Sequence, residues 1–443
     1  MKYNKIIEKL QTYNNIAILG FGMEGKSTYN FIRRYDKDMF ITILDAKEQV
    51  IDDKNAIYKK YNATQEELEE YDLIIKTPGI AIHHIRDEIR KKITSQTEIL
   101  LEFYGKNVIG ITGTKGKSTT TSLLYKVLSD QLDNVYLVGN IGIPILDDVE
   151  SFDNAIIVDE MSSNQLEYVK FSPHVGIITN LFLDHLDHSD SIEEYHEAKM
   201  NVMTHQDKDD YGIYDDDNYY MSKQDTSKIK SKLLGVSLEK KSDIYLKDEK
   251  IYLGKNVLLN LSDLKTKLKG DHNLKNIMMV LLCASIYNLD LDKTLKSISE
   301  FEPLEHRMEY VGTFKDIEFY NDSIATIPEA TINACKTIKN VDSLIFGGLE
   351  RNIEYKDLVE YLNNSSIGNF ICMPSTGHKL AQKLDQKRVI LVNTLEEAVD
   401  KAYEVTKKKC SCLLSPAAAS YEYFKNFEEK GRCYKDLVKQ KGK

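Results

Sequence analysis

Short apolar runs alternate with longer polar stretches along most of the chain. In the first hundred residues the apolar runs lie at 16–19, 41–44 and 73–75, and polar helical segments separate them. Regular alternation of strand and helix is typical of a parallel sheet covered by helices. The pattern predicts a Rossmann-like α/β domain over residues 1–103.

A second stretch begins with the apolar run 107–111, which leads into a helix expected to start near Lys117. Further strands are expected at 155–158 and 175–179. The lysine-rich segment 243–252 alternates polar and apolar positions, which predicts an antiparallel hairpin at the edge of this domain. We assign residues 104–302 to a central domain.

Strand and helix patterns resume after residue 303, with apolar runs at 343–346 and 411–414. This predicts a second Rossmann-like domain over residues 303–443. The expected fold class is therefore α/β with three domains, in agreement with a length of 443 residues, which exceeds one ordinary domain.

The composition and charge of the chain argue against several classes of function. The net charge of −10 argues against a general nucleic-acid surface. No run of about 18 apolar residues is present, so membrane insertion is not expected. The first residues carry no signal-peptide core, which favours a cytoplasmic location. The six cysteines, all from Cys283 onward, are expected to be reduced thiols because they show neither a disulfide nor a zinc pattern.

The strongest chemical signal is the loop Gly113-Thr-Lys-Gly-Lys-Ser-Thr119, between a predicted strand and a predicted helix. Glycines let the backbone wrap a phosphate, and a helix N-terminus offers unpaired N–H groups. Lys117 can neutralise phosphate oxygens and Ser118 can ligate Mg²⁺. The full pattern G-x-x-x-x-G-K-S would need glycine at position 111, where this chain has isoleucine. The segment is therefore a shortened form of a phosphate-binding loop. The residues expected to bind a nucleotide here are Gly113, Thr114, Lys115, Gly116, Lys117, Ser118 and Thr119.

Carboxylates and histidines follow two further predicted strands. Glu160, after the strand at 155–158, is expected to be a Mg²⁺ ligand beside the loop. Asp184, His185, Asp187 and His188 form an acidic, histidine-containing segment after the strand at 175–179. Such segments serve Mg²⁺ or Mn²⁺ more often than zinc.

The shortened loop G-T-x-G-K-[ST] resembles that of the Mur ligases and their folylpolyglutamate synthase relatives, and motifs resembling theirs follow in order along the chain. The resemblance implies that His185 binds a second Mg²⁺ and that Lys199, in Glu-Ala-Lys, is carbamylated and also holds metal. Carbamylation requires a neutral amine, which desolvation or nearby cations favour. Gly-Asp-His-Asn273-Leu-Lys-Asn276 resembles the segment whose asparagines bind adenine. Arg307, in His-Arg-Met-Glu, is implied to approach the phosphates, and Asp322, in Tyr-Asn-Asp-Ser, the ATP ribose.

Two regions resemble the branch of the family that adds D-glutamate to UDP-N-acetylmuramoyl-L-alanine. The first is Gly20-Phe-Gly-Met-Glu-Gly25, followed by Asp45-Ala-Lys47, which would hold the UDP group. The second, residues 413–431, is close to L-L-S-P-A-x-A-S-x-x-x-F-K-N-F-E-x-R-G. The substrate-binding residues implied are Gly22, Met23, Glu24, Asp45, Ala46, Lys47, Asn140, Thr326, Arg351, Ser420 and Phe427.

The resemblance implies a monomeric ligase that uses ATP and two Mg²⁺ ions, with Mn²⁺ possible in their place, to join glutamate to a UDP-sugar-peptide through an acyl phosphate. The catalytic residues would be Lys117, His185, Lys199 and Arg307. One departure leaves the acceptor open: Ile324 and Ile327 stand where lysine and asparagine are usual. Either the sequence of this loop has drifted without a change of function, or the acceptor is a different amino acid such as L-glutamate.

Three different functions compete with this interpretation. A nicotinamide oxidoreductase is suggested by the Gly20 turn with Asp45, but it leaves the loop at Gly113 unexplained. A folate-polyglutamylating ligase would lack the uracil-reading elements at Gly20 and Asp45. A non-catalytic binding protein would be free to lose Lys117, Glu160, His185 or Lys199, and all four are present.

Overall fold

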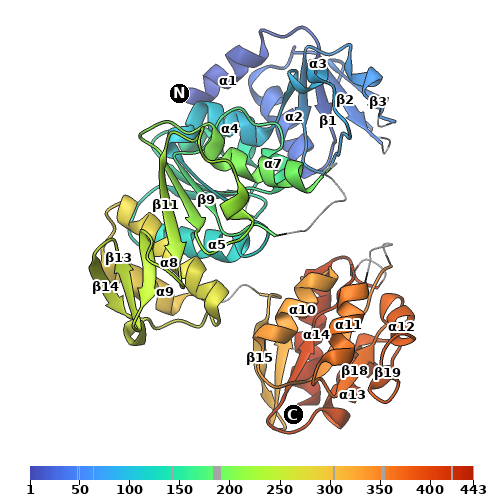
Figure 1. Cartoon of the computed structure of the whole chain (residues 1–443). Helices are drawn as coiled ribbons and strands as arrows, with labels where there is room; N and C mark the ends of the chain where they lie inside the picture. Colours follow the sequence, from blue (N-terminus) through green and yellow to red (C-terminus); the bar gives the residue numbers. More distant parts are fainter. Residues whose placement is uncertain are drawn as a thin grey trace. The chain divides into compact units, whose positions relative to one another are not determined.

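The chain folds into three sheets dominated by parallel strands, so the predicted α/β class is confirmed (Figure 1). The computed structural model describes residues 1–46, 48, 50–62, 64–141, 143–182, 191–302, 305–350, 355–420 and 423–442. The chain divides into two compact units, Met1–Phe301 and Glu302–Lys443. The first unit contains two sheets and the second unit contains one.

The first sheet has five parallel strands in the order β3-β2-β1-β4-β5. Its strands are β1 (Ile16–Leu19), β2 (Ile41–Asp45), β3 (Ala56–Lys60), β4 (Leu73–Lys76) and β5 (Ile93–Thr94). The helices around it are α1 (Lys2–Leu10), α2 (Met23–Tyr35), α3 (Asp87–Arg90) and α4 (Gln96–Tyr104). Side chains of α1, α2 and α4 pack against Ile16 and Ile18 on one face, and Ile89 of α3 packs against the other. The predicted strands at 16–19, 41–44 and 73–75 are all present.

The second sheet has nine strands in the order β14-β13-β12-β11-β10-β9-β6-β8-β7. They are β6 (Val108–Thr112), β7 (Val135–Gly139), β8 (Ile156–Glu160), β9 (Val175–Ile178), β10 (Tyr211–Asp215), β11 (Lys232–Ser237), β12 (Ile244–Lys247), β13 (Lys250–Leu253) and β14 (Asn256–Asn260). Strands β12 and β13 are antiparallel, as are β13 and β14, which confirms the predicted edge hairpin. Asp248 and Glu249 form its two-residue turn with φ of 48° and 56°, as a tight hairpin requires.

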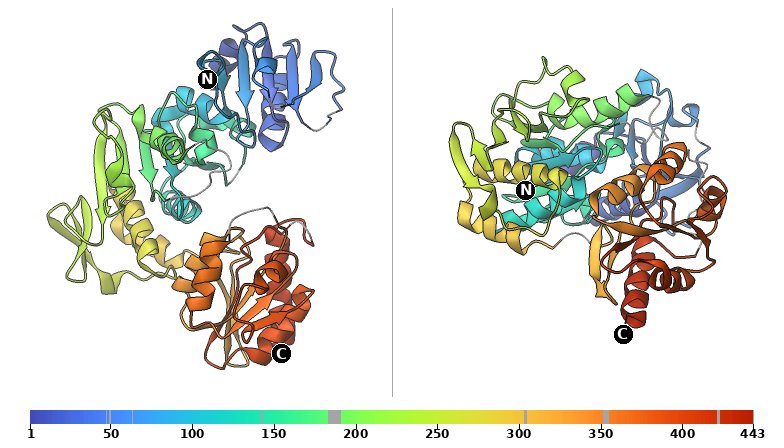
Figure 2. Two further views of the ribbon diagram at one scale, coloured as in Figure 1. Left: turned by 45° about the vertical axis from the view of Figure 1, so that its right-hand side comes forward. Right: turned by 60° about the horizontal axis from the view of Figure 1, so that its bottom comes forward.

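Five helices accompany this sheet: α5 (Lys117–Ser129), α6 (Ser163–Leu166), α7 (Ile192–Thr204), α8 (Asp271–Ile286) and α9 (Leu291–Glu300). Helix α7 starts where expected, because the Ser191 hydroxyl accepts a hydrogen bond from the Glu194 N–H at 3.1 Å. Strands β9, β6 and β8 are neighbours, so the loops at their carboxyl ends lie side by side. Figure 2 shows α8 and α9 beside the antiparallel edge of the sheet.

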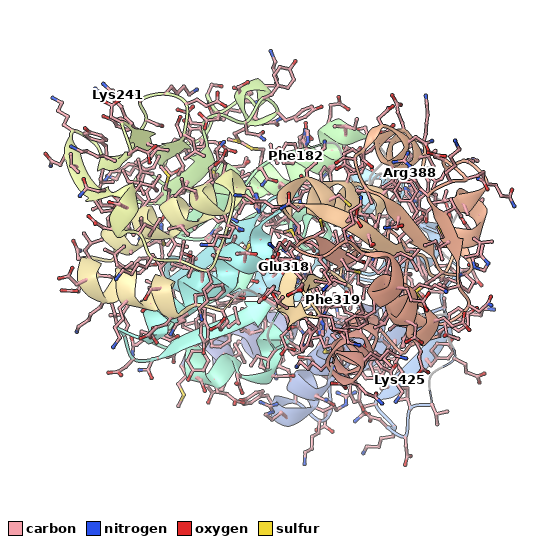
Figure 3. The ribbon with its side chains drawn as sticks, turned by 90° about the horizontal axis from the view of Figure 1, so that it is seen from below. Phe182, Lys241, Glu318, Phe319, Arg388 and Lys425 are labelled. Atoms are coloured by element: carbon pink, nitrogen blue, oxygen red, sulfur yellow. The ribbon has the colours of Figure 1, made fainter. Side chains whose placement is uncertain are left out.

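The third sheet has six strands in the order β15-β16-β20-β17-β18-β19, of which only β15 is antiparallel to its neighbour. The strands are β15 (Glu309–Phe314), β16 (Ile317–Asn321), β17 (Val341–Phe346), β18 (Asn369–Cys372), β19 (Val389–Leu391) and β20 (Ser411–Leu414). The helices are α10 (Pro328–Thr337), α11 (Lys356–Asn364), α12 (Thr376–Ala381), α13 (Leu395–Val405) and α14 (Phe427–Lys441). Helices α10, α11 and α12 pack on one face and α13 and α14 on the other, where Phe319 is fully buried. Figure 3 labels Phe319 next to Glu318, its neighbour in β16.

The cysteines agree with the expectation from the sequence, since all six are free thiols and four of them are buried. Among the helices of the described ranges, none combines the length and apolar character needed to span a membrane.

Candidate active site

The predicted phosphate-binding loop connects β6 to α5. Gly116 is the N-cap of α5 with φ of +84°, and no side chain caps this helix end. Gly113 has φ of +142°, and a Cβ there would lie 2.0 Å from the Thr179 hydroxyl oxygen. Both glycines are therefore required by the turn, and the first N–H groups of α5 remain available to an anion.

Two lysines converge on this loop. The Lys117 Nζ donates to the carbonyl oxygens of Gly113 and Thr114 at 2.9 and 3.2 Å. The Lys199 Nζ, from α7, donates to the same Gly113 oxygen at 3.0 Å. Two ammonium groups at one carbonyl repel each other, so an anion at this place would stabilise both.

Lys199 is buried, with 2% of its surface exposed, although most helical lysines are solvated. Its ammonium lies 4.5 Å from the centre of the Tyr195 ring. The Tyr195 hydroxyl in turn donates to the Thr114 hydroxyl at 3.4 Å. Lys199 therefore contacts the loop directly, as a member of the candidate site.

Two acidic residues end β8. The Glu160 carboxylate is fully buried and accepts a hydrogen bond from the Asn140 side chain at 2.7 Å. Its second oxygen has no hydrogen-bond partner among the described residues. Burial, together with the charges of Glu24 and Glu160, raises the pKa of the neighbouring Asp159 to about 8. Asp159 is thus mostly neutral near pH 7, which removes one like charge beside Glu160.

These groups suit a divalent cation. A buried carboxylate oxygen without a donor is costly unless a cation or water satisfies it. Ser118 lies in the first turn of α5, the position at which phosphate-binding loops carry the hydroxyl for Mg²⁺. No group of three or more His, Cys, Asp or Glu side chains is arranged as a metal site within the described ranges. The predicted ligand His185 lies outside the described residues.

The two asparagines expected to bind adenine lie in the first turns of α8. Asn276 is buried, and its side chain lies next to the loop. A Cβ added to Gly116 would lie 2.9 Å from the Asn276 side-chain oxygen. Its amide donates to the Asn273 side chain at 3.3 Å. The fold thus brings residues far apart in sequence next to the start of α5.

The glycine turn of the first sheet lies at the carboxyl end of β1. Gly22 is the N-cap of α2 without a side-chain cap, and space around it is open. The Asp45 carboxylate, at the end of β2, accepts a hydrogen bond from the Phe21 N–H at 2.6 Å. Met23 and Ala46, also predicted to bind substrate, are exposed beside these two positions in the sequence. An open helix start of this kind suits a diphosphate.

Glu24 and Lys76 connect the first sheet to the second. The Glu24 carboxylate accepts a hydrogen bond from the Gln165 side chain at 3.2 Å. Burial raises the pKa of Glu24, while Gln165 and the charge of Lys76 oppose this shift. Lys76 is buried at the end of β4, and its ammonium pairs with the Glu167 carboxylate at 3.4 Å. Burial lowers the pKa of Lys76 despite the nearby carboxylates.

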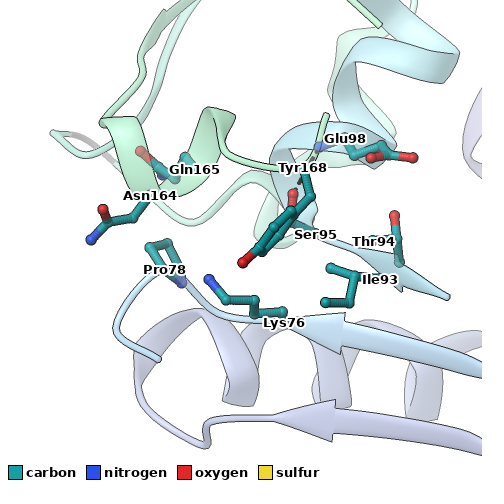
Figure 4. Close-up of a pocket in the computed structure, with 9 residues that line it drawn as sticks. All are labelled: Lys76, Pro78, Ile93, Thr94, Ser95, Glu98, Asn164, Gln165 and Tyr168. Atoms are coloured by element: carbon teal, nitrogen blue, oxygen red, sulfur yellow. Dashed lines mark hydrogen bonds between the residues drawn. The ribbon is translucent and has the colours of Figure 1, made fainter. Parts of the chain in front are cut away.

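A small pocket surrounds Lys76, which lies beneath the Tyr168 ring in Figure 4. Its lining residues are Lys76, Pro78, Ile93, Thr94, Ser95, Glu98, Asn164, Gln165 and Tyr168. The free space has about the volume of one water molecule. We therefore interpret it as a hydration site between the two sheets.

The second unit carries its own group of predicted residues at the carboxyl ends of β16 and β20. The Asp322 carboxylate accepts hydrogen bonds from the Met308 N–H at 3.1 Å and the Ser415 hydroxyl at 2.8 Å. Burial raises its pKa to about 7, although Ser415, Met308 and the charge of Arg307 oppose this shift. Arg307 is half-buried.

The residues expected to bind the acceptor belong to the same unit. Ser420 is buried, and its hydroxyl has no hydrogen-bond partner among the residues described. Phe427 begins α14, with its ring 6.2 Å from that of His306. Thr326 is half-buried just before α10, whose N-cap is Ile327. Lys47 and Arg351, also expected to bind substrate, lie outside the described residues.

The Asp322 environment predicts a pH-dependent stability. Its folded pKa of about 7 exceeds the ordinary 3.8, so the native state binds more protons than the unfolded state between these values. Stability should therefore fall as pH rises through this range, at up to about 1.4 kcal/mol per pH unit. Asp322→Asn keeps an acceptor for the Met308 N–H and cannot ionise. Its melting temperature relative to wild type should rise from pH 5 to pH 7.5 and then level off.

The measurement is thermal unfolding without ligands, followed by circular dichroism. Asp436→Asn, which removes an exposed carboxylate from α14, is the matched control, and its difference from wild type should stay constant. Parallel curves for Asp322→Asn and wild type would contradict the raised pKa.

Asp159, Gln165 and Lys430 are buried polar residues that are not among the site residues predicted from the sequence. Asp159 stands out in the sequence only as a neighbour of Glu160, and Lys430 only as part of a C-terminal motif. For Asp159 and Lys430 the available signal is a charged residue inside an otherwise apolar strand or helix face, because such residues are rarely fully buried without a role. Gln165 forms a local capping box with Ser162, but its amide also reaches Glu24, 141 residues away, and Lys430 reaches Gly347, 83 residues away. Spacing along the chain does not reveal these distant contacts.

Comparisons with known proteins cover nearly the whole chain. The Mur ligase middle domain matches residues 111–284, and the Mur ligase glutamate ligase domain matches residues 306–418. The UDP-N-acetylmuramoylalanine–D-glutamate ligase of Oenococcus oeni is 32% identical, covering 96% of this chain and 97% of its own. The enzyme of the same name from Caldanaerobacter subterraneus subsp. tengcongensis is 33% identical, covering 91% and 92%.

Solved structures share the fold at low sequence identity. The MurF ligase from Thermotoga maritima, in complex with ADP, has a TM-score of 0.60 at 16% identity and covers 96% of this chain and 95% of its own. A pseudomurein peptide ligase type C from Methanothermus fervidus has a TM-score of 0.61 at 17% identity, covering 96% and 99%.

Proposed function

Since the chain belongs to the Mur ligase family, we propose that it uses ATP to join D-glutamate to UDP-N-acetylmuramoyl-L-alanine, forming ADP and phosphate. The observation that carries the proposal is the convergence of Lys117 and Lys199 on the Gly113 carbonyl at the uncapped start of α5. The D-glutamate ligases at 32% and 33% identity support the choice of substrates. A cytoplasmic enzyme of peptidoglycan precursor synthesis follows from this assignment.

The loop provides binding and charge neutralisation for the phosphates of ATP. The first N–H groups of α5 would hold the phosphate oxygens, and Asn273 and Asn276 would meet the adenine. Lys117, released from two backbone carbonyls, can follow the γ-phosphoryl group as negative charge spreads over its oxygens. Arg307 and Asp322, in the second unit, would contact the phosphates and the ribose.

Magnesium is the expected metal. Ser118 and Glu160 would hold one ion, with His185 and a carbamylated Lys199 on a second. Bound Mg²⁺ neutralises phosphate charge and orients the transferred group. Asn140 keeps the Glu160 carboxylate fixed through its 2.7 Å hydrogen bond, so one oxygen is oriented by protein and the other is available.

The proposed chemistry has two steps. The alanyl carboxylate of the UDP-sugar attacks the γ-phosphorus of ATP, which gives an acyl phosphate and ADP. The amine of glutamate then attacks the acyl carbon, and phosphate leaves as the amide bond forms. Phosphorylation is needed because a carboxylate oxygen is otherwise a poor leaving group. The Gly22 turn and Asp45 would hold the UDP end, so that the carboxylate reaches the loop.

The acceptor assay tests this function. Phosphate release from ATP with UDP-N-acetylmuramoyl-L-alanine should require glutamate, and glutamine or alanine should be poor substitutes. Thr326, Arg351 and Ser420 are expected to pair both carboxylates, and an unpaired buried carboxylate is costly. D-Glutamate should give a higher kcat/KM than L-glutamate, mainly through kcat, because inversion moves the amine off the line of attack.

Reactions without the UDP-sugar-peptide provide the control for uncoupled ATP hydrolysis. A clear preference for L-glutamate would mean that Ile324 and Ile327 mark an altered pocket, and it would overturn the stereochemical assignment. Absence of glutamate-dependent phosphate release with either isomer would reject the proposed function.

A further inference from the structure

We propose that Lys430 is a positioning residue for the amino-acid acceptor, because it fixes the turn between β17 and the segment leading to Arg351. This inference rests on the proposed function, since it concerns how the second unit binds glutamate. Lys430 lies in the first turns of α14 and is 1% exposed. A charged side chain is rarely buried to this extent unless it is paired.

The Lys430 ammonium donates to the carbonyl oxygen of Gly347 at 2.9 Å. The link joins residues 83 positions apart, between α14 and the end of β17. A hydrogen bond from a charged donor is stronger than one between neutral groups. Lys430 therefore fixes the backbone at the point where the chain leaves the sheet.

Gly347 and Gly348 form a turn that tolerates no side chains. Their φ angles are +128° and +154°. A Cβ on Gly347 would lie 2.2 Å from the Met373 carbonyl, and one on Gly348 would lie 2.4 Å from the Ala419 carbonyl. The turn is thus packed against backbone on both sides, and small displacements of it move its neighbours.

Hydrogen bonds connect this turn to the segment that carries Ser420. The Gly347 N–H donates to the Pro416 carbonyl at 2.9 Å, and the Leu349 N–H donates to the Ala419 carbonyl at 2.9 Å. The Gly348 carbonyl accepts from the N–H of Thr376 at 2.9 Å. Lys430 adds a hydrogen bond to the Gly347 carbonyl. One cation therefore supports both the glycine turn and the segment that carries Ser420.

Besides holding the turn in place, Lys430 contributes a positive charge. Glutamate carries two carboxylates, and the Lys430 charge lies at the turn that leads to Arg351, which is expected to pair with one of them. Burial preserves its field, because solvent screens it less than an exposed charge. Loss of this charge should weaken glutamate binding without affecting the ATP loop.

The test is steady-state phosphate release by Lys430→Met, with ATP, the UDP-sugar-peptide and D-glutamate varied in turn. The KM for glutamate should rise roughly 10- to 100-fold, the range for losing a hydrogen bond to a charged group. The KM values for ATP and the UDP-sugar-peptide should stay within about threefold, as should kcat at saturating glutamate. Lys430→Arg should restore most of the glutamate affinity, since arginine occupies this place in the C-terminal pattern.

Lys407→Met is the matched control. It removes a lysine whose ammonium pairs with Asp342 at 2.9 Å. Asp342 lies near the start of β17, whereas Gly347 follows the end of this strand. Because Lys407 is exposed, its ion pair contributes little, so the melting temperature should change little and the KM for glutamate should stay unchanged. If Lys430→Met does not fold, Lys430→Gln, which keeps an N–H donor and most of the volume, takes its place.

The outcomes separate the two proposals. Equal rises in all three KM values, or an unchanged KM for glutamate, would overturn the positioning role while leaving the proposed function intact. Wild-type enzyme without glutamate-dependent turnover would overturn both.

Discussion

Lys117→Ala is expected to retain the fold and lose nearly all activity. Lys117 is the first residue of α5, where alanine is a good helix former, so stability should change little. The ammonium is needed only once phosphate charge develops, and losing one such preorganised group costs roughly 10²–10³ in rate. Phosphate release under saturating substrates measures the loss, and circular dichroism checks the fold.

Lys126→Ala is the control on the same helix. Lys126 pairs with Asp130 at 2.9 Å across one exposed turn, and such a pair contributes well under about 1 kcal/mol. It should keep wild-type turnover. Activity of Lys117→Ala within about tenfold of wild type would reject the phosphate-binding assignment.

Lys199→Ala should be nearly inactive and partly restored by added short carboxylic acids. If Lys199 is carbamylated, its function lies in two anionic oxygens that hold metal, and a small carboxylate can replace them. Lys199→Arg keeps a positive charge but cannot form the carbamate, so it should remain inactive. Phosphate release with and without high concentrations of formate or acetate provides the measurement.

This experiment also separates metal binding from the contact in the structure. Lys199 donates to the Gly113 carbonyl at 3.0 Å, and loss of that hydrogen bond alone would also lower activity. Only the carbamate predicts rescue by carboxylates and a carbamate carbon signal in NMR spectra with isotopically labelled bicarbonate. Lys208→Ala, an exposed lysine just beyond α7, should behave as wild type. Full activity of Lys199→Arg would exclude the carbamate.

The sequence alone determined the elements and the chemistry of single loops. Apolar runs predicted β1, β2 and β4 to within a residue, because buried parallel strands leave continuous apolar segments. The Gly113–Thr119 loop was predicted equally well, because its backbone turn requires glycine at positions 113 and 116. The hairpin of β12 and β13 followed from the alternation of polar and apolar positions in a lysine-rich segment, which is typical of half-exposed strands.

Asp159 and Glu160 mark the limit of what a local pattern can predict. The sequence placed both after a strand, but they are the last residues of β8 and are fully buried. Adjacent strand residues point to opposite faces, so their surroundings depend on other strands and loops. The raised pKa of Asp159 comes mainly from that burial and from the charge of Glu24 in α2, neither of which local sequence can show.

Lysines illustrate the same division most clearly. The sequence singles out Lys199 through its motif, but it does not show which groups Lys76, Lys199 and Lys430 pair with. Each of the three is at least 95% buried and pairs with a group more than 80 residues away. Spacing along the chain identifies strands, helices and loops because those depend on neighbouring residues. Which charged side chain becomes buried, and what it pairs with, is decided only when distant segments pack together, since burial and pairing are properties of the tertiary contacts.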